Sequence, residues 1–224
     1  MPYSEEKMKN KTKKLVMIGL FCAIAFVFTN IGNLIPIRFA GFLSFDPKDA
    51  VIVIAGFALG PYVTIAISVA VAFIELISIS STGVIGFIMN IIASVAYAFI
   101  PAFVYKTTRT YKSAMASLAV SSAITVALML LWNFLITPVY MHVPRAVVEG
   151  MLVPVFLPFN IIKCLMNTIL VALLYKPMVK ILRRVGLLPP SRKIKREKKK
   201  QKAQNGIDVN KYIICSKREH ALNK

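Results

Sequence analysis

Long apolar segments alternate with short polar connections from about residue 15 to residue 185. A helix that crosses a bilayer needs about 20 mostly apolar residues. Five segments meet or approach this length: 15–31, 62–79, 84–105, 113–140 and 151–184. A sixth, 49–59, is short and ends at Gly60-Pro61, and such a helix is tolerated where protein neighbours satisfy its ends. The pattern predicts an all-α integral membrane protein, a bundle of six transmembrane helices.

The remaining residues divide the chain into three parts. We expect a cytoplasmic N-terminal segment at 1–14, the membrane domain at 15–185, and a basic cytoplasmic tail without fixed structure at 186–224. Within the membrane domain, polar loops are expected at 32–48, 106–112 and 142–150, and a tight turn at 80–83.

Charge predicts how the bundle is oriented. Of 28 Lys and Arg residues, 12 follow Gly186 and five precede Leu15, and the 106–112 loop and the end of the last helix are also basic. The opposite side carries only Arg38, Lys48 and Arg145. Because cytoplasmic loops are enriched in Lys and Arg, both termini are predicted to be cytoplasmic, which agrees with the six spans of a multi-pass membrane protein.

Several functional classes lack their usual residues. The chain has no nucleotide-binding loop and no Ser, His and acid set inside the helices, and its three cysteines have no metal-ligand spacing. The sequence therefore predicts no enzyme, no metal and no cofactor. The basic tail suits anionic lipid headgroups, whereas nucleic-acid binding is disfavoured because no aromatic platform accompanies the charge.

The strongest candidate site lies on the last helix. Asn160, Lys163 and Asn167 occupy positions i, i+3 and i+7, which share one helical face. An ammonium is costly inside a membrane and must face a partner, a cavity or a ligand. These donors suit a ligand rich in carbonyl and ring-nitrogen acceptors. Alternatively, Lys163 pairs with Glu75 and the amides join helices.

Other helices add polar positions to this hypothesis. Asn133, Thr137 and Tyr140 share a face of the fifth helix, and Asn90 lies in the fourth. We predict that they line a binding site. The alternative for the fifth helix is a kink at Pro138 with aromatic side chains at the membrane interface.

The first loop and the first helix carry two further candidates. Phe42 and Phe45 could stack on a flat ligand, with the loop as a lid, or belong to an interfacial aromatic belt. Asp46 and Asp49 are interpreted as caps of the short helix. Gly19 and Ala23 form a small-x-x-x-small pattern, which suits either partner docking or internal packing.

Five motifs together resemble the substrate-binding S components of energy-coupling factor (ECF) vitamin transporters, most closely the riboflavin-specific type. They are LSFDPKDA at 43–50, Gly60-Pro61, TGVIGFIMN at 82–90, NFLITPVYM at 133–141 and LPFNIIK at 157–163. The resemblance covers residues 13–185 and leaves the basic tail without an interpretation.

The resemblance implies a function and a set of partners. It implies a six-helix protein of a bacterial plasma membrane that binds riboflavin from outside, in a site built by the first loop and helices four to six. It also implies docking, through small residues matching Gly19 and Ala23, on a transmembrane coupling protein driven by two cytoplasmic ATPases. The open alternatives are an S component for thiamine, folate or pantothenate, and an ion-coupled carrier, although no acid other than Glu75 lies in the interior of a span.

Overall fold

The computed structural model describes residues 2–34, 38–39, 43–44, 46–78 and 83–184. The chain divides into two compact units, Met1–Lys180 and Ile181–Lys224, and only residues 181–184 of the second are described. Phe42, Phe45, the expected turn at 80–83 except Gly83, and the predicted tail at 186–224 lie outside the described residues.

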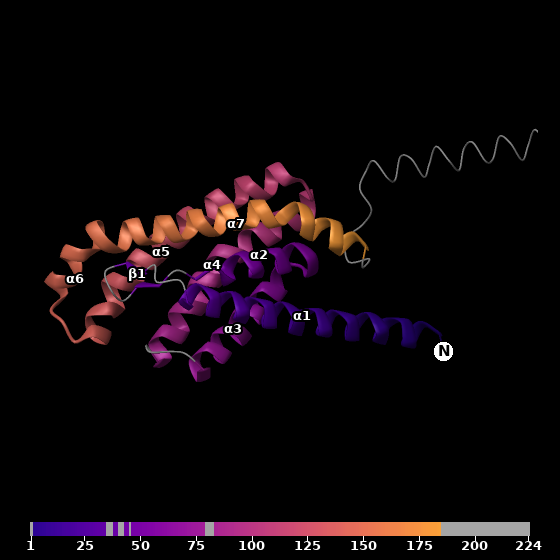
Figure 1. The fold of residues 1–224 in the computed structure, drawn as a ribbon, viewed down its shortest axis with the longest axis horizontal. Coiled ribbons are helices and arrows are strands. Elements are labelled where there is room, and N and C mark those ends of the chain that lie inside the picture. The colour runs from indigo at the N-terminus through magenta and orange to yellow at the C-terminus, as the bar shows by residue number, and fades with distance from the viewer. Residues whose placement is uncertain (1, 35–37, 40–42, 45, 79–82, 185–224) are drawn as a thin grey trace, which may run out of the picture. The chain divides into compact units, whose positions relative to one another are not determined.

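The described part is almost entirely helical (Figure 1). The helices are α1 (Pro2–Leu34), α2 (Lys48–Leu59), α3 (Pro61–Ser78), α4 (Gly83–Thr108), α5 (Tyr111–Met141), α6 (Arg145–Met151), the π-helical turn η1 (Leu152–Phe156) and α7 (Leu157–Arg184). Two short strands, β1 (Arg38–Phe39) and β2 (Leu43–Ser44), pair antiparallel between α1 and α2.

Five stretches of the described residues are long and apolar enough to cross a membrane. They are Thr12–Gly32, Pro61–Ser78, Gly83–Thr108, Tyr111–Val139 and Arg145–Ile181. With the short α2, they make up the six predicted helical segments, and the chain is a multi-pass membrane protein. The last stretch is continuous through α6, η1 and α7, where Pro154 lacks the amide hydrogen of a regular helix and a π-helical turn replaces one α-helical turn.

Two predicted loops are wrong in extent. The loop expected at 142–150 is helical from Arg145, after Pro144, whose ring presets a helix-compatible φ. The loop expected at 106–112 shrinks to Arg109 and Thr110, and the Thr110 side chain accepts a hydrogen bond from the backbone of Ser113 at the start of α5. Hydropathy locates the membrane-embedded part of a helix, whereas polar residues can extend the helix beyond it.

The short helix α2 lies at the centre of the packing. All residues from Lys48 to Phe57 are buried, and α2 packs on α1, α3 and α4. A Cβ at Gly56 would overlap Thr64 of α3 and come within 2.7 Å of the Ala102 Cβ of α4. Gly60, with φ of 103°, ends α2, and Pro61 begins α3. Glycine therefore permits both the close packing and the sharp turn.

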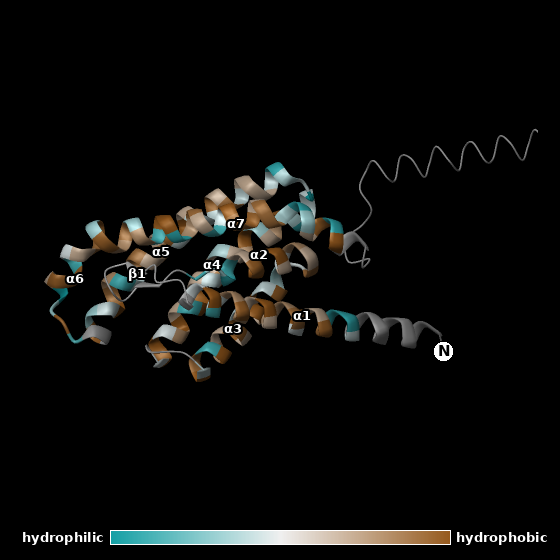
Figure 2. Cartoon of the chain, in the orientation of Figure 1, coloured by the Kyte–Doolittle hydropathy of each residue, from teal (hydrophilic) through white to brown (hydrophobic). Residues whose placement is uncertain are grey.

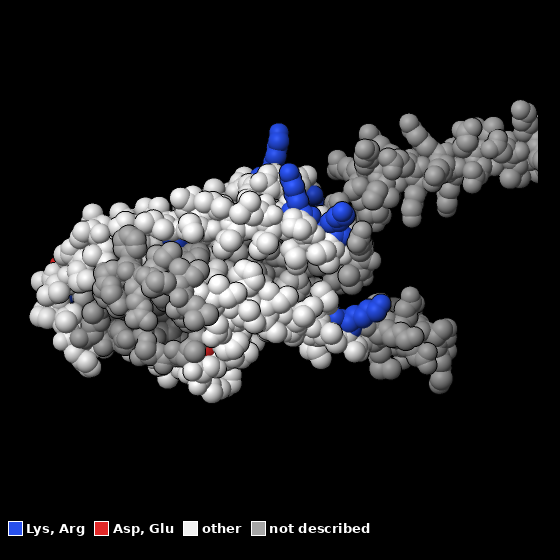
Figure 3. Space-filling model, in the orientation of Figure 1, with Lys and Arg blue, Asp and Glu red and all other residues white. Residues whose placement is uncertain are grey.

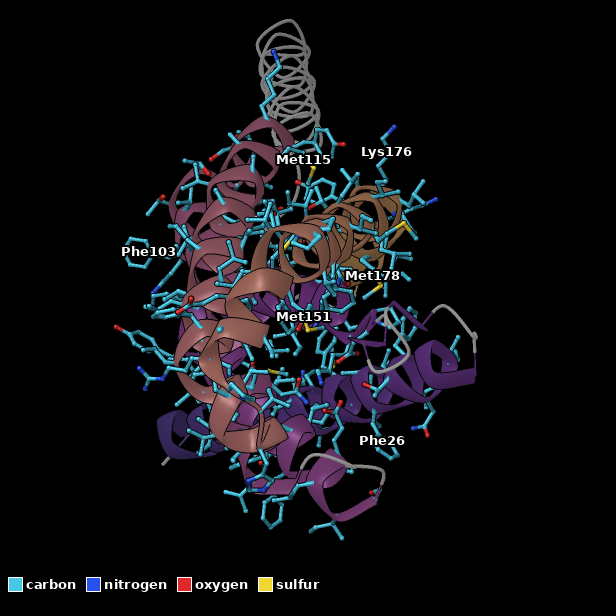
Figure 4. All side chains as sticks on the ribbon, turned by 90° about the vertical axis from the view of Figure 1, so that its left-hand side faces the viewer. Phe26, Phe103, Met115, Met151, Lys176 and Met178 are labelled. Carbon is cyan, nitrogen blue, oxygen red and sulfur yellow. The ribbon has the colours of Figure 1, made fainter. Side chains whose placement is uncertain are left out.

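The outward faces of the spanning helices are apolar (Figure 2). Exposed large side chains occur on every span, such as Val27, Phe73, Leu131 and Leu173, and Phe103 of α4 points away from the helices (Figure 4). Such a surface suits contact with lipid tails.

Basic side chains gather at the end of the first unit where α1 starts (Figure 3). The exposed residues of this basic end are Lys13, Lys14, Lys106, Arg109, Lys112, Lys176 and Lys180. They come from the N-terminal half of α1, the α4–α5 connection and the C-terminal part of α7, so these three regions lie at the same end.

Long side chains connect α7 to α4. The hydroxyl groups of Tyr97 and Thr168 are 2.9 Å apart. Nearer the basic end, the hydroxyl groups of Tyr105 and Tyr175 are 3.1 Å apart, and the ring centroids of Tyr105 and Phe57 are 4.4 Å apart with the rings tilted by 38°. α7 is thus held to α4 by long side chains, whereas α4 and α5 pack closely on one another.

Candidate ligand-binding site

A cavity of about 50 Å³ lies between α2, α4, α5 and α7. Its polar lining consists of Asp49, Asn90, Tyr97, Thr125, Asn133, Asn160, Lys163 and Asn167. Its apolar lining consists of Met89, Ala93, Met129, Phe159 and Cys164. Apolar walls with a few converging polar groups are the usual form of a small-molecule site.

Helical periodicity explains how α7 contributes. Asn160, Lys163 and Asn167 all reach the cavity, as expected of positions i, i+3 and i+7. Asn160 and Asn167 are buried, whereas the Lys163 side chain keeps 17% of its surface exposed. This face is turned toward the protein interior although its neighbours Ile161, Leu165 and Ile169 are exposed.

The asparagine amino groups are directed to protein acceptors. The Nδ2 of Asn133 donates to the Met129 carbonyl at 2.7 Å, and that of Asn160 to the Phe156 carbonyl at 2.8 Å. The Nδ2 of Asn90 donates to Glu75 at 3.1 Å. Since carbonyl and carboxylate oxygens only accept, these partners fix which end of each amide faces them.

A buried cluster of charges lies beside the cavity and joins α1 to α4. The Lys48 Nζ is 2.6 Å from Asp46 Oδ2 and 2.5 Å from Glu75 Oε2. The Thr29 hydroxyl donates to Glu75 Oε1 at 2.8 Å, and Asn90 reaches the same carboxylate from α4. Every polar atom of Glu75 is therefore engaged, as a buried charge requires.

A second ion pair is looser. The Lys163 Nζ lies 3.8 Å from Asp49 Oδ2, while Ser94 donates to Asp49 Oδ1 at 2.5 Å. At 3.8 Å, Lys163 retains capacity to donate to another group.

The carboxyl group of Asp46, which precedes α2, is held in its ionised form. Burial raises its pKa, but the ammonium groups of Lys48 and Lys163 and the hydrogen bonds from Lys48 outweigh burial and lower the pKa below its ordinary value. The negative charge that holds Lys48 in place is therefore present at neutral pH.

Comparisons with known proteins place the chain in a family. Residues 13–175 match the family model of the substrate-specific component of ECF transporters. The riboflavin transporter RibU of Staphylococcus aureus is 27% identical over 181 residues, covering 78% of this chain and 95% of that protein. The riboflavin transporter FmnP of Bacillus subtilis is 30% identical over 174 residues, covering 74% and 91%.

A solved structure supports the same family assignment. The S component of a bacterial ECF transporter matches with a TM-score of 0.64 and 27% identity, over 77% of this chain and 98% of that one. The chain belongs to the ECF S components. These relatives are transporters and not enzymes, in line with the sequence-based expectation.

Five predicted binding residues of this S component meet at one cavity: Asn90, Asn133, Asn160, Lys163 and Asn167. Thr137 lies one turn beyond Asn133, is buried, and donates to Asn133 Oδ1 at 2.9 Å. It supports the amide and is not part of the described lining. The side chain of Tyr140 lies outside the described residues.

One alternative interpretation of the charged residues is wrong: Glu75 pairs with Lys48 and not with Lys163, whose described partner is Asp49. Asp46 and Asp49 lie at the start of α2 as expected, and Asp46 Oδ1 accepts a hydrogen bond from the backbone N–H of Lys48. Asp49 has a further role that was not predicted, since it lines the cavity and accepts a hydrogen bond from Ser94. Lys48, counted among the outer-loop charges, is 2% exposed. The sequence did contain a signal for the buried charge cluster: Lys48 lies between Asp46 and Asp49, and the next span contains one acid, Glu75.

The predicted docking residues lie on the outer surface of α1. Gly19 and Ala23 are exposed, and a Cβ at Gly19 would meet no atom within 4 Å. The small-residue pattern is therefore not used for packing within the described chain.

Proposed function

We propose that this S component binds riboflavin in the cavity between α4, α5 and α7. One observation carries the proposal: five polar side chains from three helices converge on a single apolar cavity, in a chain whose relatives include riboflavin transporters. The isoalloxazine ring has apolar faces and a polar edge, which apolar walls with a few polar groups suit.

Riboflavin requires the cavity to widen. Sites for small molecules usually measure about 300–1,000 Å³, whereas this cavity measures about 50 Å³. Met89, Met129 and Phe159 line it. Unbranched methionine side chains repack at low cost, and α7 is held to α4 by long side chains. Movement of α7 away from α4 is therefore the least costly way to admit the ring.

The complete proposal includes uptake into a bacterial cell. Riboflavin enters from the outside, both termini lie in the cytoplasm, and the outer face of α1 around Gly19 and Ala23 docks on a transmembrane coupling protein with two ATPase subunits. Riboflavin is then the transported substrate and not a cofactor.

Titration of the purified protein tests the binding step. Riboflavin fluorescence should be quenched with a dissociation constant in the nanomolar range. Thermal shift with thiamine, folate and pantothenate separates the alternatives, because the true ligand stabilises the fold by RT ln(1 + [L]/Kd). Stabilisation by another vitamin, with no response to riboflavin, would overturn the choice of ligand.

A further inference from the structure

One buried acceptor of the cavity lining has no partner. Asn167 of α7 is 1% exposed and lines the cavity. Its Oδ1 accepts no hydrogen bond within the described part of the chain. A buried polar atom without a partner is costly and uncommon, and it calls for an explanation.

The orientation of the Asn167 amide is fixed by its neighbours. Its Nδ2 donates to the backbone carbonyl of Asp46 at 3.1 Å and to that of Lys163 at 3.2 Å. An amide nitrogen has two hydrogens, and both acceptors are carbonyl oxygens that cannot donate. Rotating the amide would set its oxygen against two other oxygens. The carbonyl is therefore the end of Asn167 left for the cavity.

Several other polar groups of the lining are already engaged. Asn133 donates to Met129 and accepts from Thr137. The Thr125 hydroxyl donates to the Ser121 carbonyl at 2.8 Å. Lys163, one helical turn before Asn167, is 3.8 Å from its acidic partner. The lining thus offers a donor, Lys163, and an acceptor, Asn167, on the same face of α7.

We infer that the Asn167 carbonyl accepts a hydrogen bond from an uncharged N–H or O–H group of the ligand, beside an acceptor of the ligand that faces Lys163. Asn167 then favours ligands that carry a hydrogen-bond donor at this point. The sequence had instead suggested that Asn167 itself donates to the ligand. The inference rests on the proposed function. Riboflavin has two sources of such a donor, the imide N–H of the ring and the hydroxyls of the ribityl chain.

The test compares three flavins on two proteins. Affinities of riboflavin, N3-methylriboflavin, which lacks the imide N–H, and lumiflavin, which lacks the ribityl hydroxyls, are measured for wild type and Asn167→Leu. We expect the substitution to weaken riboflavin binding about 10-fold, as for loss of a buried hydrogen bond. The analogue that lacks the engaged donor should bind wild type about 10-fold more weakly than riboflavin does, and Asn167→Leu should reduce its affinity little further. The analogue that behaves in this way identifies which flavin group donates to Asn167.

A matched control is Ser68→Ala. The Ser68 Oγ in α3 is likewise buried without a partner in the described residues, but Ser68 does not line the cavity. Its removal should leave all three affinities unchanged.

Two results overturn the inference. In one, Asn167→Leu weakens all three flavins equally, as a purely structural role predicts. In the other, neither analogue binds wild type more weakly than riboflavin, a comparison that remains decisive if the variant does not fold. Failure of wild type to bind any flavin refutes the proposed function instead, so the two failures are distinguishable.

Discussion

Lys48 is the side chain whose surroundings most constrain substitution. It lies buried between Asp46 and Glu75, within 2.6 Å of both carboxylates. Removing one partner of a buried ion pair leaves an uncompensated charge, and this costs more than the pair itself contributes. The cluster also holds Asn90, which lines the cavity, so it connects stability to the site.

We therefore predict that Lys48→Met destabilises the protein by about 3–5 kcal/mol. Thermal unfolding of purified protein in detergent measures the loss. Adding Glu75→Gln should recover part of it, because one uncompensated carboxylate is then neutral. A single variant as stable as wild type would show that Lys48 does not neutralise these acids.

Lys163 is the residue for which we predict the largest effect on binding. Its ion pair with Asp49 is long, and Asp49 also accepts a hydrogen bond from Ser94 that does not involve Lys163. Lys163→Ala should therefore leave the fold intact and weaken riboflavin roughly 10- to 100-fold, as for loss of a hydrogen bond from a charged group of about 1.5–3 kcal/mol. Asn133→Ala should weaken it less. Fluorescence titration measures the affinity, and thermal unfolding curves measure the stability of the same variants. A parallel loss of stability and affinity would contradict the assignment of Lys163 to ligand binding.

The sequence could predict those site residues that helical periodicity relates to one another. The shared face of Asn160, Lys163 and Asn167 follows from their spacing, and they reach one cavity. The partners of Lys48 and Lys163 could not be read in this way, since Lys48 and Glu75 are 27 residues apart. Spacing along one helix says nothing about which charge on another element it meets. It also cannot say which end of an amide faces the ligand.

At the scale of elements, α2 depends on Gly56. A methyl group there would overlap Thr64 and Ala102. We predict that Gly56→Ala forces α2 away from α3 and α4 and costs about 1–3 kcal/mol, as overpacking does. Gly19→Ala is the matched control, since a Cβ there meets nothing, and a helical Gly to Ala change should be neutral or stabilise by about 0.5–1 kcal/mol. Equal effects in thermal unfolding would refute the close packing of α2.

The sequence predicted the membrane-embedded parts of the helices better than their ends. α2 and α3 begin and end within one residue of expectation, because Gly60-Pro61 marks their junction and apolar content marks the rest. α6 was missed because Arg145 and Glu149 suggest a loop. Charged residues such as Arg and Glu are good helix formers when they are exposed to solvent. A change from apolar to polar sequence therefore does not mark the end of a helix.

For the whole molecule, the basic end implies an orientation. The starts of α1 and α5 and the ends of α4 and α7 carry the exposed Lys and Arg residues of this end (Figure 3). We predict that, with Cys215→Ser removing the tail thiol, an impermeant maleimide labels Glu149→Cys on intact cells. Lys112→Cys should react only after permeabilisation. Cys22 and Cys164 are buried and should contribute little. The reverse labelling would place both termini outside.

The outer face of α1 permits binding and transport to be separated. Gly19 has open space around its Cβ position, so Gly19→Trp should fold and bind riboflavin as wild type does. If the coupling protein docks on this face of α1, the variant should nevertheless lose riboflavin uptake. Ile77→Trp, on an equally open part of α3, should retain uptake. If Gly19→Trp reduced binding and uptake together, the separation of cavity from docking face would be wrong.

The position of α5 beside the cavity has a practical consequence. The chain contains one tryptophan, Trp132, and it immediately precedes the cavity residue Asn133. All indole emission from the protein therefore originates at a single residue next to the lining of the proposed site. A flavin, which absorbs near-ultraviolet light, would dim that emission on entry, so the unlabelled chain carries its own optical reporter of occupancy.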